Sequence, residues 1–252
     1  MYLIFFLSVV QGVTEFVPIS SSSHLIILSR YFDFENNGIL IDVSLHIGSF
    51  IAVITFFYRD LINFFQDKRL FLKIVIASLP VMIVGFFLIQ TNFIIYLRNI
   101  EIIAWMTISF GILLYVSDRN QLQNQIEDNL NYKSALIIGL FQVLSLIPGV
   151  SRSGITITAG RLLKFERYDA AKISFLLSIP TLGAVSLFGL GKIITTNNIN
   201  LSMLNFTAII LSFFFSFITI KFFLQFLKKF NLTIFVFYRL ILGTVLLFIV
   251  YL

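Results

Sequence analysis

Long apolar runs limit what this chain can fold into more than any other feature of its sequence. Residues 39–58 and 204–227 are clear examples, and each contains only one or two charged residues. A helix of about 20 such residues spans the hydrocarbon core of a bilayer. Of the 252 residues, 58% are hydrophobic and 12% are charged, whereas soluble domains have about 25% charged residues. We therefore expect an all-α polytopic membrane protein.

Six runs are predicted to be membrane helices from their length and apolar composition. They cover 40–58, 70–90, 101–117, 173–191, 203–225 and 232–252. The apolar N-terminus lacks the basic residues and the small-residue cleavage site of a signal peptide, so we expect it to belong to the mature protein. The chain has no cysteine, which excludes disulfides, thiolate nucleophiles and cysteine-bound metals.

The formal net charge of +6 is best explained by membrane topology. Thirteen of the 18 Lys and Arg residues lie in four polar joints, which fall on one side if 40–58 runs inward: 59–73, 118–133, 161–172 and 221–229. The opposite joints hold only Arg30, Arg98 and Lys192. Because cytoplasmic loops carry an excess of basic residues, the four joints are predicted to be cytoplasmic. No nucleic-acid partner is expected.

Two polar stretches interrupt the apolar pattern, FVPISSSSHLI at 16–26 and IPGVSRSGITI at 147–157. The segments beside them are too short to cross a bilayer: 1–17, 20–31, 134–147 and 154–165. Proline removes a backbone donor and serine favours turns. Because broken backbone at membrane depth must be buried in protein or line a wet cavity, we predict two re-entrant broken-helix hairpins.

The assumed topology makes the two hairpins enter from opposite sides, so that their tips meet near the bilayer midplane, as in inverted repeats. A shift of 130 residues aligns the two stretches, placing Pro18 on Pro148, Ser21 on Ser151 and Ser23 on Ser153. We expect one membrane domain, 1–252, with inverted-topology halves 1–117 and 133–252. A polar cytoplasmic loop, 118–132, is predicted to join them.

The first stretch carries groups suited to general base or metal chemistry. Gln11 and Glu15 are spaced i, i+4 and share a helix face directed toward the tip. A lone carboxylate within a membrane indicates a functional site. Beside the serines and His24, Glu15 is suited to bind a divalent cation or to act as a general base. Alternatively, Glu15 only pairs with a cation of the second hairpin while the serines satisfy freed backbone groups.

The second stretch is suited to bind an anion. Ser151, Arg152, Ser153 and Gly154 open a predicted helix. The N–H groups at a helix N-terminus favour phosphate, and an arginine fork adds two charge-assisted hydrogen bonds. The alternative is a structural ion pair between Arg152 and Glu15. Both interpretations are compatible with one site before substrate binds.

Several motifs in order resemble the membrane undecaprenyl-diphosphate phosphatases, also called bacitracin-resistance proteins. They are QGVTEFVPISSSSHL at 11–25, IDVSLHIG at 41–48, PGVSRSGITI at 148–157, SFLLSIPTLGA at 174–184 and YRLILG at 238–243. The resemblance implies hydrolysis of a polyprenyl diphosphate lipid to its monophosphate, which recycles the lipid carrier of cell-wall synthesis. It also implies a location in the bacterial plasma (inner) membrane, a divalent cation, Mg²⁺ or Ca²⁺, a site that faces the periplasm, and a homodimer.

The same resemblance assigns roles to individual residues. Ser21 and His24 are implied as the nucleophile and its base, and either can be the attacking group, since both fit Ser-x-x-His spacing around a turn. Glu15 and Gln11 are implied to hold the metal, and Arg152 to grip the diphosphate. The implied substrate contacts are Ser20, Ser151, Ser153, Gly154, Thr156 and Gln142.

Three residues depart from the family pattern. Gln11 replaces a glutamate, which removes one carboxylate from the implied metal site. Ser23 replaces a glycine and so disfavours a left-handed turn at this position. His46 replaces a glutamine. We expect His46 to be a hydrogen-bonded packing residue; the alternative is a second ionisable group near the site. Asp42 and Arg239, in otherwise apolar helices, are expected to pair with each other or with the site.

A transporter or flippase for a polyprenyl phosphate or similar anion is the second functional hypothesis, because inverted repeats with a midplane site are common among carriers. A hydrolase needs Ser21 or His24 as a reacting group, whereas a carrier needs only residues that bind. The family resemblance favours the hydrolase.

Overall fold

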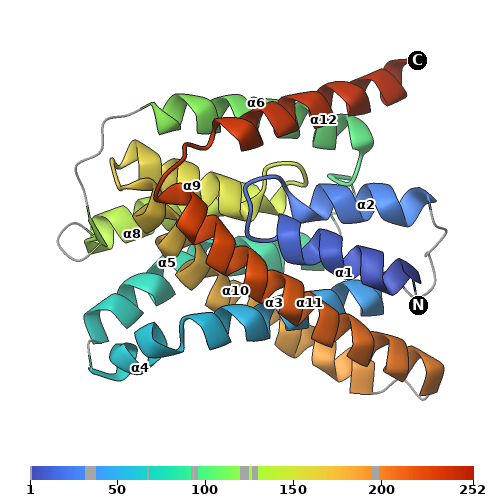
Figure 1. The fold of residues 1–252 in the computed structure, drawn as a ribbon, viewed down its shortest axis with the longest axis horizontal. Helices are drawn as coiled ribbons and strands as arrows, with labels where there is room; N and C mark the ends of the chain where they lie inside the picture. The colour runs from blue at the N-terminus through green and yellow to red at the C-terminus, as the bar shows by residue number, and fades with distance from the viewer. Residues whose placement is uncertain are drawn as a thin grey trace.

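The computed structural model describes residues 2–31, 38–66, 68–91, 93, 96–119, 125–126, 130–194 and 199–252. The elements that build the fold are helices packed side by side (Figure 1). They are α1 (Tyr2–Thr14), α2 (Ser21–Tyr31), α3 (Gly38–Phe56), α4 (Tyr58–Gln66), α5 (Lys68–Gln90), α6 (Ile100–Asp118), α8 (Tyr132–Val143) with the 3-10 turn η2 (Leu144–Leu146), α9 (Arg152–Leu162), α10 (Arg167–Ile194), α11 (Ile199–Leu227) and α12 (Thr233–Tyr251).

Five described helices are long and apolar enough to cross a membrane, which confirms a polytopic α-helical membrane protein. They are α5, α6, residues 167–191 of α10, residues 203–227 of α11, and α12. The sixth predicted span, 40–58, corresponds to α3 but is shifted by two residues, because α3 covers Gly38–Phe56 and the separate helix α4 begins at Tyr58.

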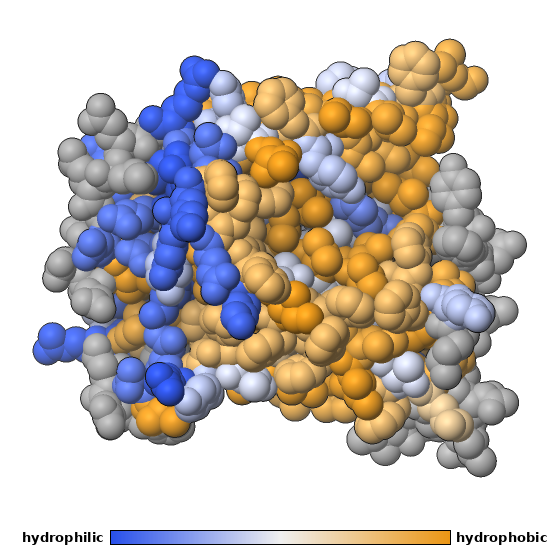
Figure 2. Space-filling model, in the orientation of Figure 1, coloured by the Kyte–Doolittle hydropathy of each residue, from blue (hydrophilic) through white to orange (hydrophobic). Residues whose placement is uncertain are grey.

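Hydrophilic residues gather along one edge of the molecule, at the left of Figure 2, beside a broad apolar surface. The same edge in Figure 1 holds α4 and the connections from α9 to α10 and from α11 to α12. Three of the predicted basic joints, 59–73, 161–172 and 221–229, therefore lie at one edge. Residues 120–124 and 127–129 of the predicted loop 118–132 lie outside the described residues.

Both predicted breaks occur at the prolines, between α1 and α2 and between η2 and α9. The residue before each following helix, Ser20 or Ser151, has a positive φ of 73° or 70°. Their hydroxyls accept the backbone N–H groups of Ser23 and Gly154, at 3.4 and 3.1 Å. Ser20, and not Ser21, is thus the local counterpart of Ser151, so the aligned pairing was wrong by one residue. Ser23 lies in α2 and makes no left-handed turn.

Small residues let α11 approach α1 and α3 closely. A Cβ atom on Gly12 of α1 would lie 2.5 Å from Phe215, and one on Gly48 of α3 would lie 2.4 Å from the Ile209 carbonyl oxygen. The Ser49 hydroxyl adds a hydrogen bond of 2.9 Å to Ser216. Close packing through glycine and serine is a common way to join helices in membranes. It fixes α1 and α3 relative to each other.

Asp118 joins four helices near the hydrophilic edge. Its Oδ1 accepts from Arg161 Nε of α9 at 3.0 Å and from Arg167 Nε of α10 at 2.8 Å. Its Oδ2 accepts from the backbone N–H of Leu232, just before α12, at 3.1 Å. The carboxylate is 6% exposed and Arg161 is fully buried. One carboxylate at the end of α6 therefore holds the starts or ends of three other helices.

We expect Asp118→Asn to destabilise the protein, because it leaves the buried Arg161 guanidinium without its anion. Breaking a buried pair in this way costs about 3–5 kcal/mol. The matched control is Asp60→Asn, which breaks the 2.6 Å ion pair between Asp60 and Lys172. The side chains of this pair are 27% and 26% exposed, and exposed ion pairs contribute about 1 kcal/mol or less. Thermal unfolding in detergent measures both; equal shifts in Tm would contradict the prediction.

Candidate active site

A cavity of about 200 Å³ lies between the two helix breaks. Its polar lining includes Glu15, Ser20 and Ser21 from the first break and Ser151 and Arg152 from the second. Apolar side chains of α5 and α10 complete the wall. The structure thus brings together the two polar stretches that the sequence singled out.

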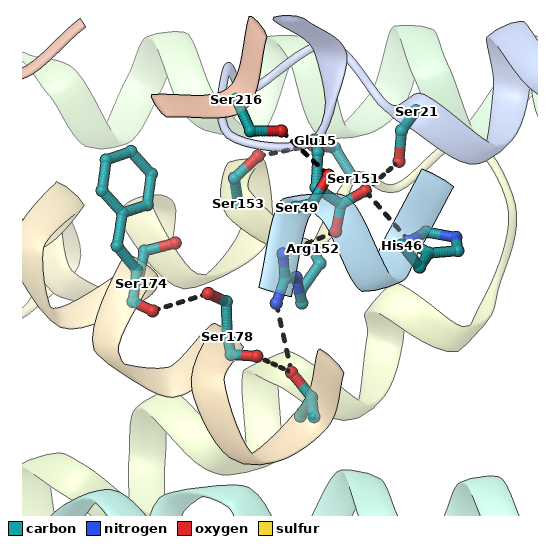
Figure 3. Close-up of polar contacts among 12 residues, drawn as sticks. Glu15, Ser21, His46, Ser49, Ser151, Arg152, Ser153, Ser174, Ser178 and Ser216 are labelled. Atoms are coloured by element: carbon teal, nitrogen blue, oxygen red, sulfur yellow. Dashed lines mark hydrogen bonds and ion pairs between the residues drawn. The ribbon is translucent and has the colours of Figure 1, made fainter. Parts of the chain in front are cut away.

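The Glu15 carboxylate is the centre of the polar contacts in this cavity (Figure 3). Its Oε1 accepts from Arg152 Nη2 at 2.7 Å. Its Oε2 accepts from Ser21 Oγ at 2.6 Å and from Gln11 Nε2 at 3.0 Å. His46 Nδ1 lies 3.8 Å from the same oxygen. A carboxylate in contact with a hydroxyl and a guanidinium is suited to accept the hydroxyl proton when an anion draws the guanidinium away.

Arg152 links three segments and still lines the cavity. It is the first residue of α9, and besides Glu15 it contacts Thr181 of α10, with 3.1 Å between Nη1 and Oγ1. Its side chain is 16% exposed. The Arg152–Glu15 ion pair exists as the alternative interpretation expected, and the same guanidinium lies where an anion in the cavity would meet it. The sequence reasoning did not single out Thr181. Its place after Pro180 in the motif at 174–184 was the only indication in the sequence that it belongs to the site.

Two of the serines predicted to contact substrate line the cavity, Ser20 and Ser151, together with Ser21. Ser20 Oγ lies 2.8 Å from Ser23 Oγ. Ser151 Oγ accepts from the backbone N–H of Gly154. Gly154 therefore takes part in the cap of α9 and is not in the cavity lining.

Three other predicted contacts lie behind the cavity wall. Ser153 Oγ donates to the Val17 carbonyl oxygen at 3.0 Å and so joins the two breaks. Thr156 Oγ1 donates to Ser174 of α10 at 2.7 Å. Gln142 is fully buried, does not line the cavity, and neither of its amide atoms has a hydrogen-bond partner among the described residues. The structure does not bring these three side chains to the cavity.

His24 also lies outside the cavity lining. Its Nδ1 is 2.6 Å from the Ser20 carbonyl oxygen and its Nε2 is 2.6 Å from Tyr238 Oη. A carbonyl oxygen only accepts hydrogen bonds, so Nδ1 carries a proton. No described contact joins His24 to Ser21. The hydroxyl of Ser21 donates to Glu15 instead. In the structure His24 is therefore hydrogen-bonded to the backbone of Ser20, the residue with a positive φ.

His46 corrects an expectation, because it is not a simple packing residue. It lines the cavity, and its Nδ1 lies 3.0 Å from Gln11 Nε2. Asp42 and His46 are spaced i, i+4 in the otherwise apolar α3, so they lie on one face of that helix. This pair of polar residues was the signal that α3 contributes to the site.

Arg239 of α12 binds both helix breaks through their main-chain carbonyls. Its Nη1 donates to Pro18 at 3.3 Å and to Val150 at 3.0 Å, and its Nη2 donates to Gly149 at 2.9 Å. Its Nε donates to Thr107 of α6 at 3.1 Å. The side chain is fully buried. Of the two partners expected for Arg239, Asp42 or the site, it contacts the site, and it does so through backbone oxygens of both breaks.

Comparison with known proteins places the whole chain in one group. Residues 4–245 match the family model described as bacitracin resistance protein BacA. The undecaprenyl-diphosphatase of Pelagibacter ubique (strain HTCC1062) is 47% identical over 249 residues, covering 98% of this chain and 97% of that protein. The undecaprenyl-diphosphatase of Jannaschia sp. (strain CCS1) is 38% identical, covering 100% of this chain and 99% of that protein. That of Saccharophagus degradans (strain 2-40) is 39% identical, covering 94% of each.

Replacing Arg239 by lysine tests its role in joining the two breaks. A single ammonium cannot reproduce a fork that donates from three nitrogens, and each hydrogen bond to a charged group contributes about 1.5–3 kcal/mol. We expect Arg239→Lys to lower Tm and to speed hydrogen exchange at residues 15–20 and 147–151. Arg59→Lys, on the exposed helix α4, is the control for the chemical change. Unchanged exchange at both breaks would show that Arg239 does not hold them.

Proposed function

The chain belongs to the bacitracin resistance protein BacA family, and we propose that the cavity between its helix breaks hydrolyses undecaprenyl diphosphate to undecaprenyl phosphate and inorganic phosphate. The relatives named undecaprenyl-diphosphatase match it over almost their full length. The observation that carries the proposal is the contact of Ser21 Oγ with Glu15 at 2.6 Å, beside Arg152. This reaction returns the lipid carrier of cell-wall synthesis to use.

In the first step Ser21 Oγ attacks the terminal phosphorus and Glu15 Oε2 accepts the hydroxyl proton. A bond forms between Oγ and phosphorus, and the bond from phosphorus to the bridging oxygen breaks. Undecaprenyl phosphate leaves and takes up the proton from Glu15. Arg152 and the N–H groups at the start of α9 stabilise the charge on the phosphoryl oxygens.

In the second step a water molecule attacks the phosphoserine. Glu15 accepts a proton from this water, and the bond between phosphorus and Ser21 Oγ breaks to release inorganic phosphate. The same proton returns the serine to its hydroxyl form. One carboxylate therefore acts as base in both steps, as expected for covalent catalysis with a single activating group.

His24 takes a positioning role in this proposal. The resemblance implied that His24 is either the base or the nucleophile, but both of its ring nitrogens are engaged, by Ser20 and Tyr238. By holding the Ser20 carbonyl, His24 supports the positive φ of the residue directly before Ser21. Histidine attack on phosphorus is the competing mechanism that a kinetic test must exclude.

A hard divalent cation suits the oxygen atoms of this site. Gln11 Oε1 is buried and has no hydrogen-bond partner among the described residues, and its amide nitrogen contacts Glu15. No group of three or more His, Cys, Asp and Glu residues suited to a metal occurs in the described part of the chain. We infer that Glu15 would hold Mg²⁺ or Ca²⁺ together with substrate phosphate oxygens, whereas Gln11, the other expected ligand, turns its NH₂ group and not its oxygen toward Glu15. The bound cation would neutralise charge on the diphosphate.

The membrane arrangement extends this proposal. We infer that the two broken segments are re-entrant hairpins of an inverted repeat whose tips meet at the bilayer midplane, with the hydrophilic edge in the cytoplasm and the cavity open to the periplasm. The contacts of Ser153 and Arg239 across both breaks support it. A homodimer stays a prediction. No observation favours the carrier hypothesis.

The decisive experiment measures phosphate release from undecaprenyl diphosphate by the purified protein in detergent, with Mg²⁺, with Ca²⁺ and with a chelator. We expect release that needs the cation and falls at least about 100-fold in Glu15→Ala and in Arg152→Ala, because each removes charge used in the transition state. Arg59→Ala, outside the cavity, is the matched control, and Tm shows whether each variant is folded. No release by folded wild-type protein would refute the proposed hydrolase.

Comparing Ser21→Ala with His24→Gln identifies the nucleophile. We expect Ser21→Ala to abolish turnover and the phosphoenzyme trapped by rapid quenching. His24→Gln should lower turnover while still forming a phosphoenzyme, because its loss loosens Ser20 without removing the attacking group. An acid-labile phosphoenzyme that persists in Ser21→Ala and disappears in His24→Gln would assign the attack to the histidine.

A further inference from the structure

His46 lies in the wall of the cavity, on a helix that the proposed mechanism does not use. Its side chain is 26% exposed, and its ring is one of the few polar groups that α3 brings to the site (Figure 3). Only Nδ1 has a hydrogen-bond partner among the described residues, namely Gln11. The other ring nitrogen, Nε2, is therefore free to meet a ligand.

The hydrogen bonds of Gln11 determine which ring nitrogen of His46 carries the proton. The Glu15 carboxylate, paired with Arg152, only accepts, so the NH₂ group of Gln11 must be the end that faces it, at 3.0 Å. The same NH₂ group lies 3.0 Å from His46 Nδ1 and donates its second hydrogen there. Nδ1 is then an acceptor, and the neutral ring carries its hydrogen on Nε2.

We propose that His46 is a further substrate-binding residue, whose neutral Nε2–H donates a hydrogen bond to a phosphate oxygen of the diphosphate. Gln11 is the positioning residue for this contact, because its amide sets the tautomer of the ring. This inference rests on the proposed function of the cavity. Arg152 and the N–H groups at the start of α9, both on one helix, were already assigned to the phosphates, and His46 adds a neutral donor from a second helix, α3.

The two histidines of the chain are held in opposite tautomers by this arrangement. In His24 the Ser20 carbonyl oxygen requires the hydrogen on Nδ1, and Nε2 accepts from Tyr238. In His46 the hydrogen lies on Nε2. A binding role for His46 therefore makes a prediction that a packing role does not: a ligand in the cavity changes the Nε2–H of His46 and leaves His24 unchanged.

Nitrogen NMR of protein labelled with ¹⁵N-histidine tests the tautomers directly. His24→Gln assigns the two rings. At a pH where both rings are neutral, we expect His46 to show a protonated Nε2 and His24 a protonated Nδ1. Methylenediphosphonate, a diphosphate analogue that is not hydrolysed, should shift the Nε2 signal of His46. A protonated Nδ1 at His46, or no response of its Nε2 to a saturating analogue that competes with substrate, would overturn the inference.

Steady-state kinetics with undecaprenyl diphosphate at saturating Mg²⁺ test the contact itself. His46→Leu removes the donor, and we expect KM to rise about tenfold or more with a smaller change in kcat, because a hydrogen bond to a charged group is lost. His46→Gln keeps a side-chain N–H and should recover most of the affinity. Thr55→Val, at an exposed position of the same helix, is the control. A KM for His46→Leu equal to that of wild type would refute the contact.

Failure of this inference differs from failure of the proposed function. If wild-type protein releases phosphate but His46→Leu binds substrate normally, the cavity is a phosphatase site without a His46 contact. If folded wild-type protein releases none, the phosphatase proposal fails first. Should His46→Leu not fold, the ¹⁵N spectrum of wild-type protein still decides whether Nε2 carries the hydrogen and responds to the analogue.

Discussion

The rest of the structure depends on one buried guanidinium, that of Arg239. Breaking two helices inside a membrane protein frees carbonyl groups that no water can satisfy, and each unpaired group there costs several kcal/mol. Arg239 donates to three of these carbonyls, of Pro18, Gly149 and Val150. A single side chain from α12 thereby binds the two breaks to each other, and the cavity exists because they are held together.

The same helix also controls the geometry around Ser21, the proposed nucleophile. Tyr238, next to Arg239, bonds His24, and His24 holds the carbonyl of Ser20. Ser20 has a positive φ, which is unfavourable for a residue with a Cβ atom and persists only when its surroundings enforce it. The active-site turn is thus supported from α12 by two neighbouring side chains, one acting on each side of the break.

The sequence was sufficient to predict what depends on local pattern. Apolar runs predicted the spans, proline and serine predicted both breaks, and the lone carboxylate Glu15 and Arg152 were expected to meet. It was not sufficient where helix rotation decides the contact: His46 faces the cavity because glycine contacts with α11 set the position of α3. The sequence left the partner of Arg239 open between Asp42 and the site for the same reason, since its acceptors are backbone oxygens that become available only after folding.

Within the cavity the groups proposed for catalysis satisfy one another, and this has a mechanistic consequence. Glu15 accepts from Arg152, Ser21 and Gln11 at once. A diphosphate carries more negative charge than one carboxylate, so it competes with Glu15 for the Arg152 fork. When Arg152 turns to the phosphate, Glu15 loses the guanidinium that stabilised its negative charge but stays in contact with Ser21. Accepting the serine proton then becomes more favourable for the Glu15 carboxylate. Substrate binding would then itself prepare the nucleophile, which keeps the serine unreactive until an anion occupies the site.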